Sequence, residues 1–299
     1  MSKSIIIDSI KASNEFNNHP TFHPLVCVTD FSKANPRCGH RMEFGIYAII
    51  LKQVDCGNLM YGKNTYDYQE GTLIFVGPGQ VLDASQNTEA YQPHGLALSF
   101  HPDLISGTRL PQLIYDYGFF SYNLNEALHL SKQEEQTIKD IFHKIDAELR
   151  QPIDKHSKKL ITSNIALLLE YCERFYDRQF ITREHINHGI LKKFEKELNG
   201  YFDSEKPYSL GLPTVSFFAD QLNLSANYFG DLVKKETGMS AQELIQAKLI
   251  EIAKDKIFDS EKSVKEVAFE LGFKYPQHFT RMFKKEVGTT PQDYRQSTE

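Results

Sequence analysis

The last third of the chain contains one pattern twice. Residues 218–224 return as residues 267–273, and residues 228–238 return as residues 278–288. The first segment returns after 49 positions and the second after 50, so the second copy has one extra residue near Lys274. A repeat of this length with this apolar spacing predicts two copies of one small helical unit. Each copy combines a small residue, a turn and a second helix with polar side chains, which is how a helix-turn-helix presents a recognition helix to DNA.

Capping residues mark where these helices begin and end. Residues 240–243 and 263–266 both match the capping box, in which a serine hydroxyl and a glutamate carboxylate satisfy exposed backbone amides. Gly272 stands at the sharp turn expected inside the second unit. Gly238 and Gly288 are expected to end the two recognition helices.

One continuous helix is expected between the two units. From Gln242 to Phe258 the apolar residues recur at helical spacing. A helix of this length spans roughly 25 Å, at about 1.5 Å per residue. Together with the width of the units, it would place the two recognition helices about one DNA turn apart, roughly 34 Å. One monomer could then read two successive major grooves.

Polar side chains around the second helix of each unit are the candidate DNA contacts. Amide and guanidinium groups form paired hydrogen bonds with base edges, whereas lysines and hydroxyls bind phosphates. The expected base-contacting residues are Asn227, Tyr228, Asp231, Lys274, Gln277, His278 and Arg281. The expected backbone-contacting residues are Ser225, Lys234, Lys235, Thr280, Lys284 and Lys285. Because Asp231 occupies the place of Arg281, and an acid near phosphates is unfavourable unless it accepts from a cytosine amino group, we expect the second unit to contribute more binding energy.

The charge of this region is close to neutral. The whole chain carries −5, and residues 214–299 contain 12 Lys or Arg against 13 Asp or Glu, a net charge of −1. Nucleic-acid-binding domains are often clearly basic, but residues 274–285 contain four basic residues and no acid. This local basic stretch predicts modest non-specific affinity that depends strongly on salt. The alternative is that both hairpins are packing modules with solvated polar side chains; two matches with the same caps and a rigid spacer favour DNA binding.

Three segments of the second copy carry a family resemblance. Residues 263–273, 279–285 and 288–295 closely resemble the C-terminal signature of AraC/XylS-type transcriptional regulators, and the resemblance extends over residues 214–295. It implies two helix-turn-helix units on a shared linker helix, binding to double-stranded promoter DNA and usually activation, with RNA polymerase as a further partner. It also implies an N-terminal cupin-like domain that senses a small molecule or mediates dimerisation. Asp231 departs from the family, because many members have a basic residue there.

Short β-rich runs dominate the first 108 residues. They are residues 44–51, 57–61, 71–76 and 94–100. Turns at residues 62–64 and 77–79 separate them, and the segment from Gly71 to Gly79 is similar to the glycine-proline turn of cupin-like barrels. Strands of this length and spacing predict a sandwich or a small barrel.

Helical patterns follow this β-rich part. Apolar residues recur at helical spacing over residues 134–149, 160–175 and 190–202, and a polar segment interrupted by proline and glycine comes next. The fold class is therefore a two-domain α+β protein, with a cupin-like barrel or sandwich, a helical connector and an all-α double helix-turn-helix. The expected segments are a β-rich sensor or dimerisation domain, a helical connector, a linker and a DNA-binding domain, over residues 1–108, 109–202, 203–213 and 214–299.

A cupin-like domain can also be an enzyme, which requires a metal site. Metal-dependent cupins supply two histidines one residue apart, a nearby carboxylate and a later histidine. Here Met42 stands where the second histidine after His40 would be, and His94 and His101 are isolated. The sequence therefore predicts neither a metal nor another cofactor, and a regulator rather than an enzyme.

A small-molecule effector is the remaining reading of a closed, aromatic-rich barrel. The candidate pocket residues are His40, Arg41, Glu43, Tyr47 and Phe75. Two alternatives stay open. The aromatic residues can belong to the core with the charged residues on the rim, or the domain binds nothing and serves only for self-association.

The helices between residues 133 and 180 have enough apolar surface for a homodimer seam, although packing against the barrel would explain the same pattern. The chain has no apolar run long enough to cross a bilayer, and its N-terminus is too short in apolar residues for a secretory signal. Four widely spaced cysteines fit a reducing compartment. We therefore expect a cytoplasmic protein with no membrane partner.

Overall fold

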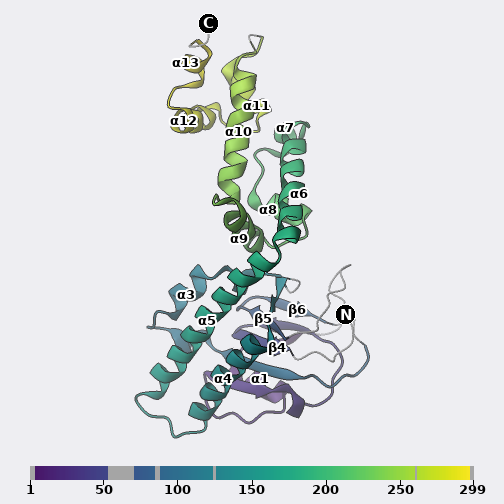
Figure 1. Ribbon diagram of the computed structural model, residues 1–299, viewed down its shortest axis with the longest axis vertical. Helices are drawn as coiled ribbons and strands as arrows, with labels where there is room; N and C mark the ends of the chain where they lie inside the picture. Colours follow the sequence, from purple (N-terminus) through teal and green to yellow (C-terminus); the bar gives the residue numbers. More distant parts are fainter. Residues whose placement is uncertain (1–3, 53–70, 85–87, 124–125, 260, 297–299) are drawn as a thin grey trace. The chain divides into compact units, whose positions relative to one another are not determined.

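The computed structural model divides into two compact units, Met1–Thr182 and Arg183–Glu299 (Figure 1). The structure describes residues 4–52, 71–84, 88–123, 126–259 and 261–296. The expected strand over residues 57–61 and the turn over 62–64 lie outside the described residues. The α+β class is confirmed, since the first unit contains the sheets and the second is helical throughout its described residues.

Two sheets form the first unit. The smaller has the order β1-β3-β6, with β1 at Ile5–Ile7, β3 at Arg41–Phe44 and β6 at Val81–Asp83. The larger has the order β2-β7-β4-β5-β8, with β2 at Val26–Asp30, β7 at Gly95–Phe100, β4 at Tyr47–Lys52, β5 at Thr72–Val76 and β8 at Leu128–His129. All pairs are antiparallel except that of β1 with β3.

The larger sheet is buried on both faces, which explains why its strands are nearly continuous apolar runs. Ala48, Ile74 and Val76 face a core that includes Phe44 of the smaller sheet. The alternate residues, such as Phe75, face the other way, because successive side chains in a strand point to opposite faces. That second face is covered by helices, and Phe75 packs there against aromatic side chains.

Five α-helices lie among the described residues of the first unit, besides two short 3-10 helices. They are α1 at Ile10–Phe16, α2 at Pro102–Ile105, α3 at Leu110–Asp116, α4 at Lys132–Leu149 and α5 at Ser157–Thr182. Helix α1 packs on β1, β2 and β7, whereas α4 packs on β2 and β7 and α5 packs on β8 and on α4. The helices expected at residues 134–149 and 160–175 are confirmed, and the second continues to Thr182.

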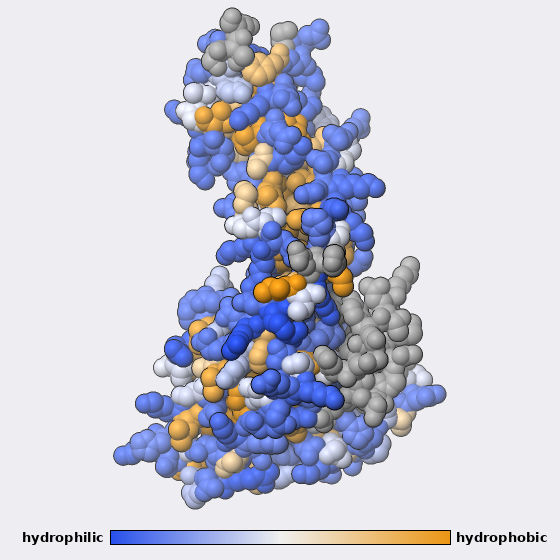
Figure 2. Space-filling view, viewed as in Figure 1, coloured by the Kyte–Doolittle hydropathy of each residue, from blue (hydrophilic) through white to orange (hydrophobic). Residues whose placement is uncertain are grey.

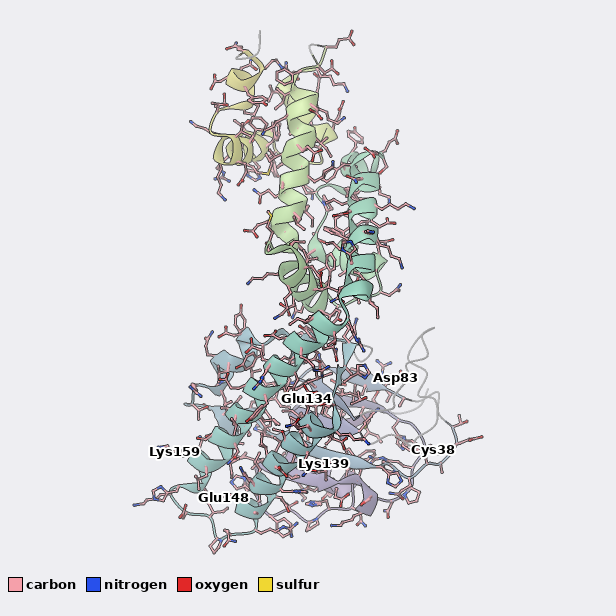
Figure 3. All side chains as sticks on the ribbon, viewed as in Figure 1. Cys38, Asp83, Glu134, Lys139, Glu148 and Lys159 are labelled. Atoms are coloured by element: carbon pink, nitrogen blue, oxygen red, sulfur yellow. The ribbon has the colours of Figure 1, made fainter. Side chains whose placement is uncertain are left out.

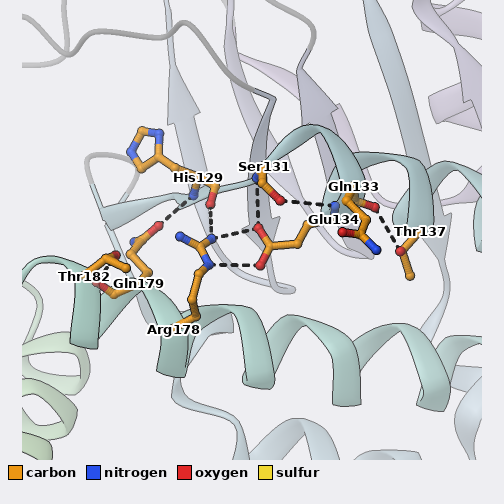
Figure 4. Close-up of polar contacts among 8 residues, drawn as sticks. All are labelled: His129, Ser131, Gln133, Glu134, Thr137, Arg178, Gln179 and Thr182. Atoms are coloured by element: carbon orange, nitrogen blue, oxygen red, sulfur yellow. Dashed lines mark hydrogen bonds and ion pairs between the residues drawn. The ribbon is translucent and has the colours of Figure 1, made fainter.

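A polar cluster joins the last turns of α5 to β8 and to the start of α4 (Figure 4). Arg178 donates to both carboxylate oxygens of Glu134, each at 2.9 Å, and to the backbone carbonyl of His129 at 2.6 Å. Gln179 accepts from the His129 amide at 2.7 Å and donates to the Ala127 carbonyl at 3.2 Å. Glu134 also accepts from the backbone amide of Ser131 in a capping box. These contacts fix the C-terminal end of α5 to the edge of the larger sheet.

The second unit contains eight helices among its described residues. They are α6 at Glu184–Phe202, α7 at Lys206–Leu210, α8 at Val215–Gln221, α9 at Ala226–Thr237, α10 at Ala241–Ile257, α11 at Val264–Glu270, α12 at Pro276–Val287 and α13 at Pro291–Gln296. Both repeats are therefore helical pairs, α8 with α9 and α11 with α12, and α10 is the continuous helix expected between them.

The division between the units falls earlier than the sequence suggested. Residues 203–213 contain α7, and α6 belongs to the second unit with both repeats. The cause is aromatic packing: Phe194 of α6 lies edge-on to Phe218 and Phe229, with ring centroids 5.2 and 5.0 Å apart. Pro207 lies in the first turn of α7, where a missing N–H costs nothing. Proline there starts a helix and does not mark a linker.

Within the part of the chain that the structure describes, no helix is both long and apolar enough to span a membrane. The faces seen in Figure 2 are mostly hydrophilic, with small apolar patches on both units.

Candidate DNA interface

The first helix-turn-helix consists of α8, a short turn and α9. Thr214 caps α8 by accepting from the Phe217 amide at 3.1 Å, and Ser225 caps α9 by accepting from the Tyr228 amide at 3.2 Å. Asn223 makes the turn between them with a φ of +56°, a left-handed conformation that asparagine tolerates better than most residues. Ala219 is fully buried at the crossing of the two helices, as its small size predicts.

The second helix-turn-helix repeats this geometry with α11 and α12. Ser263 and Glu266 form the expected capping box, with contacts of 2.7 and 3.2 Å. Gly272 makes the turn with a φ of +93°, at the position that Asn223 occupies in the first copy. Phe279 and Phe283 are fully buried under α12. The turn predicted at Gly272 is therefore confirmed.

Helix α10 connects the two units. Its capping box pairs Ser240 with Glu243, and it packs on α9, α11 and α6. At its far end the Arg295 side chain of α13 donates to the carbonyl of Ile257 at 2.5 Å, which caps a backbone group that the helix leaves free. Gly238 and Gly288 end α9 and α12 in the left-handed conformation, at φ of +74° and +89°, as predicted.

The exposed face of α12 presents most of the residues expected to contact DNA. Gln277, Arg281 and Lys284 follow one another at helical spacing, and all three are exposed. Lys274, His278 and Lys285 are also exposed. Thr280 differs, because it is half-buried and donates its hydroxyl proton to the Pro276 carbonyl at 3.2 Å. The hydroxyl proton of Thr280 is therefore already hydrogen-bonded within the helix, so a phosphate contact would have to use another group.

We call this exposed set on and just before α12 the α12 face: Lys274, Gln277, His278, Arg281, Lys284 and Lys285. An acidic side chain approaches it at its end, where Lys285 lies 3.6 Å from Glu286. The Glu286 carboxylate also accepts from Gln246 of α10 at 3.1 Å, so it is drawn towards the linker helix. The α12 face therefore carries a positive charge suited to phosphates.

The corresponding face of α9 is smaller than predicted. Asn227, Lys234 and Lys235 are exposed and Asp231 is half-buried. Tyr228 is only 5% exposed, so the prediction of a base contact by this side chain was wrong. Tyr228 and Leu232 lie one helical turn apart on the buried side of α9. In the repeat, Tyr228 corresponds to the exposed His278, so the sequence pattern does not show that one is buried and the other exposed.

One exposed aromatic residue was missed by the sequence reasoning. Tyr275 immediately precedes α12 and is 56% exposed, and its ring lies edge-on to His278 with centroids 5.5 Å apart. Its position in the turn, next to a lysine and before a helix-starting proline, is a signal that the repeat comparison did not use, because this is where the second copy has its extra residue.

The five candidate effector residues do not converge on one pocket. Arg41 and Glu43 are exposed, because the alternate residues of β3 face the core between the sheets. Arg41 lies 3.4 Å from Asp83 of β6, which is 45% exposed and is labelled in Figure 3. His40 is half-buried and lies edge-on to Phe16 of α1 at 6.0 Å.

Tyr47 and Phe75 belong to the opposite face of the larger sheet. Tyr47 stacks on Phe100 at 5.0 Å, and both Tyr47 and Phe75 pack edge-on to Phe120. Burial raises the pKa of Tyr47. The five residues therefore do not line one pocket: Phe75 is buried and Tyr47 is half-buried on this face, whereas Arg41 and Glu43 lie on another surface. Among the residues that the structure describes, no group of three His, Cys, Asp or Glu side chains could hold a metal ion.

Two helix-turn-helix units on one shared helix, each with an exposed polar second helix, define a double helix-turn-helix domain. Residues 218–297 match the family model described as "Helix-turn-helix domain". The chain is 33% identical over 113 residues to the uncharacterized HTH-type transcriptional regulator YtdP of Bacillus subtilis, covering 38% of this chain and 13% of that protein. It is 32% identical over 78 residues to the HTH-type transcriptional activator RhaS of Escherichia coli, covering 26% of this chain and 28% of that protein. The resemblance to AraC-type regulators is thereby confirmed for the C-terminal part.

A solved structure is also similar to this part of the chain. The C-terminal domain of the two-component response regulator yesN from Fusobacterium nucleatum is 26% identical, covers 35% of this chain and 95% of that chain, and has a TM-score of 0.31. The chain spans a third or less of the length of the curated relatives that it matches.

Proposed function

We propose that this protein is a sequence-specific transcriptional regulator, most simply an activator, that reads two successive major grooves with α9 and α12. The observation that carries the proposal is the α12 face, in which exposed amide, imidazole and basic side chains stand on a recognition helix whose other side is a buried aromatic core. Arg281 lies at its centre, and a guanidinium can bind a guanine edge with two hydrogen bonds.

The two helix-turn-helix units contribute unequally to DNA binding in this proposal. The α12 face has several basic side chains, whereas α9 offers Asn227 with Lys234 and Lys235 and places Asp231 where α12 has Arg281. Removing Tyr228 from the contact set leaves α9 with fewer groups for base recognition than the sequence suggested. Most of the binding energy and of the salt dependence then comes from the second helix-turn-helix.

The N-terminal unit, Met1–Thr182, is proposed to be a cupin-like sensor or dimerisation domain. Its two packed sheets support the cupin-like reading, and the face of α5 supports dimerisation. Leu160 and Leu167 stand two helical turns apart on α5, with 48% and 43% of their surface exposed. A homodimer through this face would place two DNA-binding units on one promoter, and activation would bring RNA polymerase there.

An effector, where one binds, would act through the sheets. The contacts of Arg178 and Gln179 with β8 carry any shift of that strand to the last turns of α5, next to the end of the first unit. The effector would then bias the DNA-competent state by binding one arrangement better than another. An enzyme is the rival reading, and it has less support because the relatives' names describe transcriptional regulators.

Selection from random duplex oligonucleotides tests the proposal. The purified 299-residue chain should enrich a bipartite site with half-sites about one helical turn apart, roughly 10 base pairs. Arg281→Ala should lose the preference at one base position, whereas the control Lys196→Ala removes an exposed charge from α6 and should change nothing. Absence of enrichment at low ionic strength would refute the function. Sedimentation of Leu160→Glu with Leu167→Glu tests the dimer.

A further inference from the structure

The turn of the second helix-turn-helix is in contact with a segment that precedes the first. A β-carbon at Gly272 would lie 2.7 Å from the carbonyl carbon of Gly211, 2.8 Å from its oxygen and 2.9 Å from the carbonyl oxygen of Pro207. Real β-carbons do not come closer than about 3 Å to such atoms, so the two backbones meet directly only because residue 272 has no side chain.

The left-handed φ of this turn is not a sufficient reason for glycine. Asn223 makes the equivalent turn of the first unit with a φ of +56° and a side chain in place. The second helix-turn-helix therefore needs glycine at position 272 for the close approach of Gly211 as well as for the backbone conformation of its turn. This difference between two otherwise matching turns identifies a contact that is particular to the second unit.

Gly211 is itself attached to the first helix-turn-helix. Its carbonyl oxygen accepts from the hydroxyl of Tyr201 at 2.8 Å, and its amide donates to the carbonyl of Pro207 at 2.9 Å. Tyr201 is 2% exposed, and its ring packs edge-on to Phe217 of α8 with centroids 5.1 Å apart. The segment of α7 and Gly211 thus runs from the core of the first helix-turn-helix to the turn of the second helix-turn-helix.

These contacts give the two helix-turn-helix units a second connection besides α10. A single linker helix sets the distance between two modules but leaves them able to pivot at its ends. Attachment at a second point, where α7 also packs against α11, removes that freedom. Preorganised binding sites pay less ordering entropy when they bind, and they discriminate more sharply against a ligand of the wrong spacing.

We propose that residues 206–211 form a strap that fixes the placement of α12 relative to α9, and that Tyr201 is a positioning residue for recognition of a bipartite DNA site. The inference rests on the proposed two-site DNA binding and adds the element that sets its spacing. Loss of the strap should leave each helix-turn-helix folded and able to bind its own half-site. The selectivity for one distance between half-sites should fall.

The test compares variants of the 299-residue chain on DNA of defined spacing. Tyr201→Phe keeps the ring and removes the hydroxyl that holds Gly211, and the matched control Tyr208→Phe removes a hydroxyl from a side chain that is 77% exposed on α7. A second variant replaces residues 206–210 with a flexible segment of glycine and serine. Affinity is measured for the selected site, for sites with one base pair added or removed between the half-sites, and for the half-site read by α12 alone.

Tyr201→Phe should weaken binding to the selected site by about 2- to 10-fold, the range of one hydrogen bond, and the strap replacement should weaken it more. Both should bind the isolated half-site like the wild type, and the preference for the selected spacing should shrink. An unchanged spacing preference in both variants would overturn the strap, as would an equal loss on the half-site and the full site.

Hydrogen exchange separates this proposal from the proposed function. The amides of Gly272 and Phe273 should exchange faster in Tyr201→Phe than in Tyr208→Phe, whether or not DNA is bound. If no DNA site is selected but exchange accelerates, the function fails and the strap stands as a structural connection. If a bipartite site is selected and neither exchange nor spacing preference changes, the strap fails and the function stands.

Discussion

The ring of Phe194 meets that of Phe229 edge-on, with centroids 5.0 Å apart and planes inclined by 72°. This contact joins α6 to the recognition helix of the first helix-turn-helix, and both side chains are fully buried. The folding unit of the DNA-binding part therefore begins near residue 183, about thirty-five residues before the repeat itself.

Truncation should reveal this boundary. A fragment of residues 183–299 should unfold cooperatively, whereas residues 214–299 should be much less stable, because the fragment lacks the aromatic rings that cover Phe218 and Phe229. Phe194→Ala in the longer fragment should lower the free energy of unfolding by about 3–5 kcal/mol, the usual cost of removing a buried phenylalanine. Urea denaturation followed by circular dichroism measures both effects. Equal stability of the two fragments would contradict the assignment of α6 to this unit.

Arg281 and Lys284 should behave differently on DNA although both are exposed on α12. Arg281→Ala should cost about 1–3 kcal/mol on the selected site and relax specificity at one base position, as expected for a guanidinium that binds a base edge. Lys284→Ala should weaken binding to all sequences alike and reduce the salt slope by about 1. Affinities across a base-substitution series at several salt concentrations distinguish the two. A uniform effect of Arg281→Ala would assign it to the phosphates instead.

Two glycines and one asparagine give a graded test of the turns. Gly288→Ala should destabilise by about 1–2 kcal/mol, the cost of a left-handed residue with a β-carbon, because nothing lies within 4 Å of that carbon. Gly272→Ala should cost more, since its β-carbon would overlap the backbone of Gly211. Asn223→Gly should have little effect, as its backbone already has the conformation that glycine accepts. Urea unfolding gives the order, and equal losses at Gly272 and Gly288 would contradict the close approach.

Local signals in the sequence predict α10 and the second helix-turn-helix well. The capping boxes at Ser240 and Ser263, the positive φ of Gly272 and the helix through α10 depend on neighbouring residues only, so the pattern contains them. Burial depends on contacts between distant segments. Tyr228 turned out to be buried although its partner in the repeat is exposed, and no spacing within one helix could show that.

The candidate effector residues do not converge for a related reason. Arg41 and Glu43 lie close to Tyr47 in the sequence, but β3 and β4 belong to different sheets, so closeness along the chain does not place these side chains together. The role of Pro207 was hidden in the same way. Proline and glycine mark both the start of a short helix and a linker, and the contact that distinguishes them is with Gly272, 65 positions later.

The stability of the second helix-turn-helix should depend on pH through Glu270. Its carboxylate lies 2.7 Å from the ammonium of Lys262 and 3.2 Å from that of Lys256, and the hydrogen bond from Lys262, with Lys256 adding to it, lowers the pKa of Glu270. A lowered pKa in the folded protein stabilises it above the unfolded value, about 4.3, and this stabilisation is lost as the pH falls through the folded value.

Glu270→Gln should therefore destabilise the protein at pH 7 and matter less as the pH falls below about 4. The side chain is 33% exposed, so solvent screening keeps the effect below about 1 kcal/mol. The control Glu195→Gln changes an exposed glutamate of α6 and should shift the curve by much less. Urea midpoints from pH 3 to pH 7 measure the difference. A constant gap between Glu270→Gln and the wild type across this range would show that the ion pairs do not set the acid dependence, because a protonated Glu270 cannot attract either lysine.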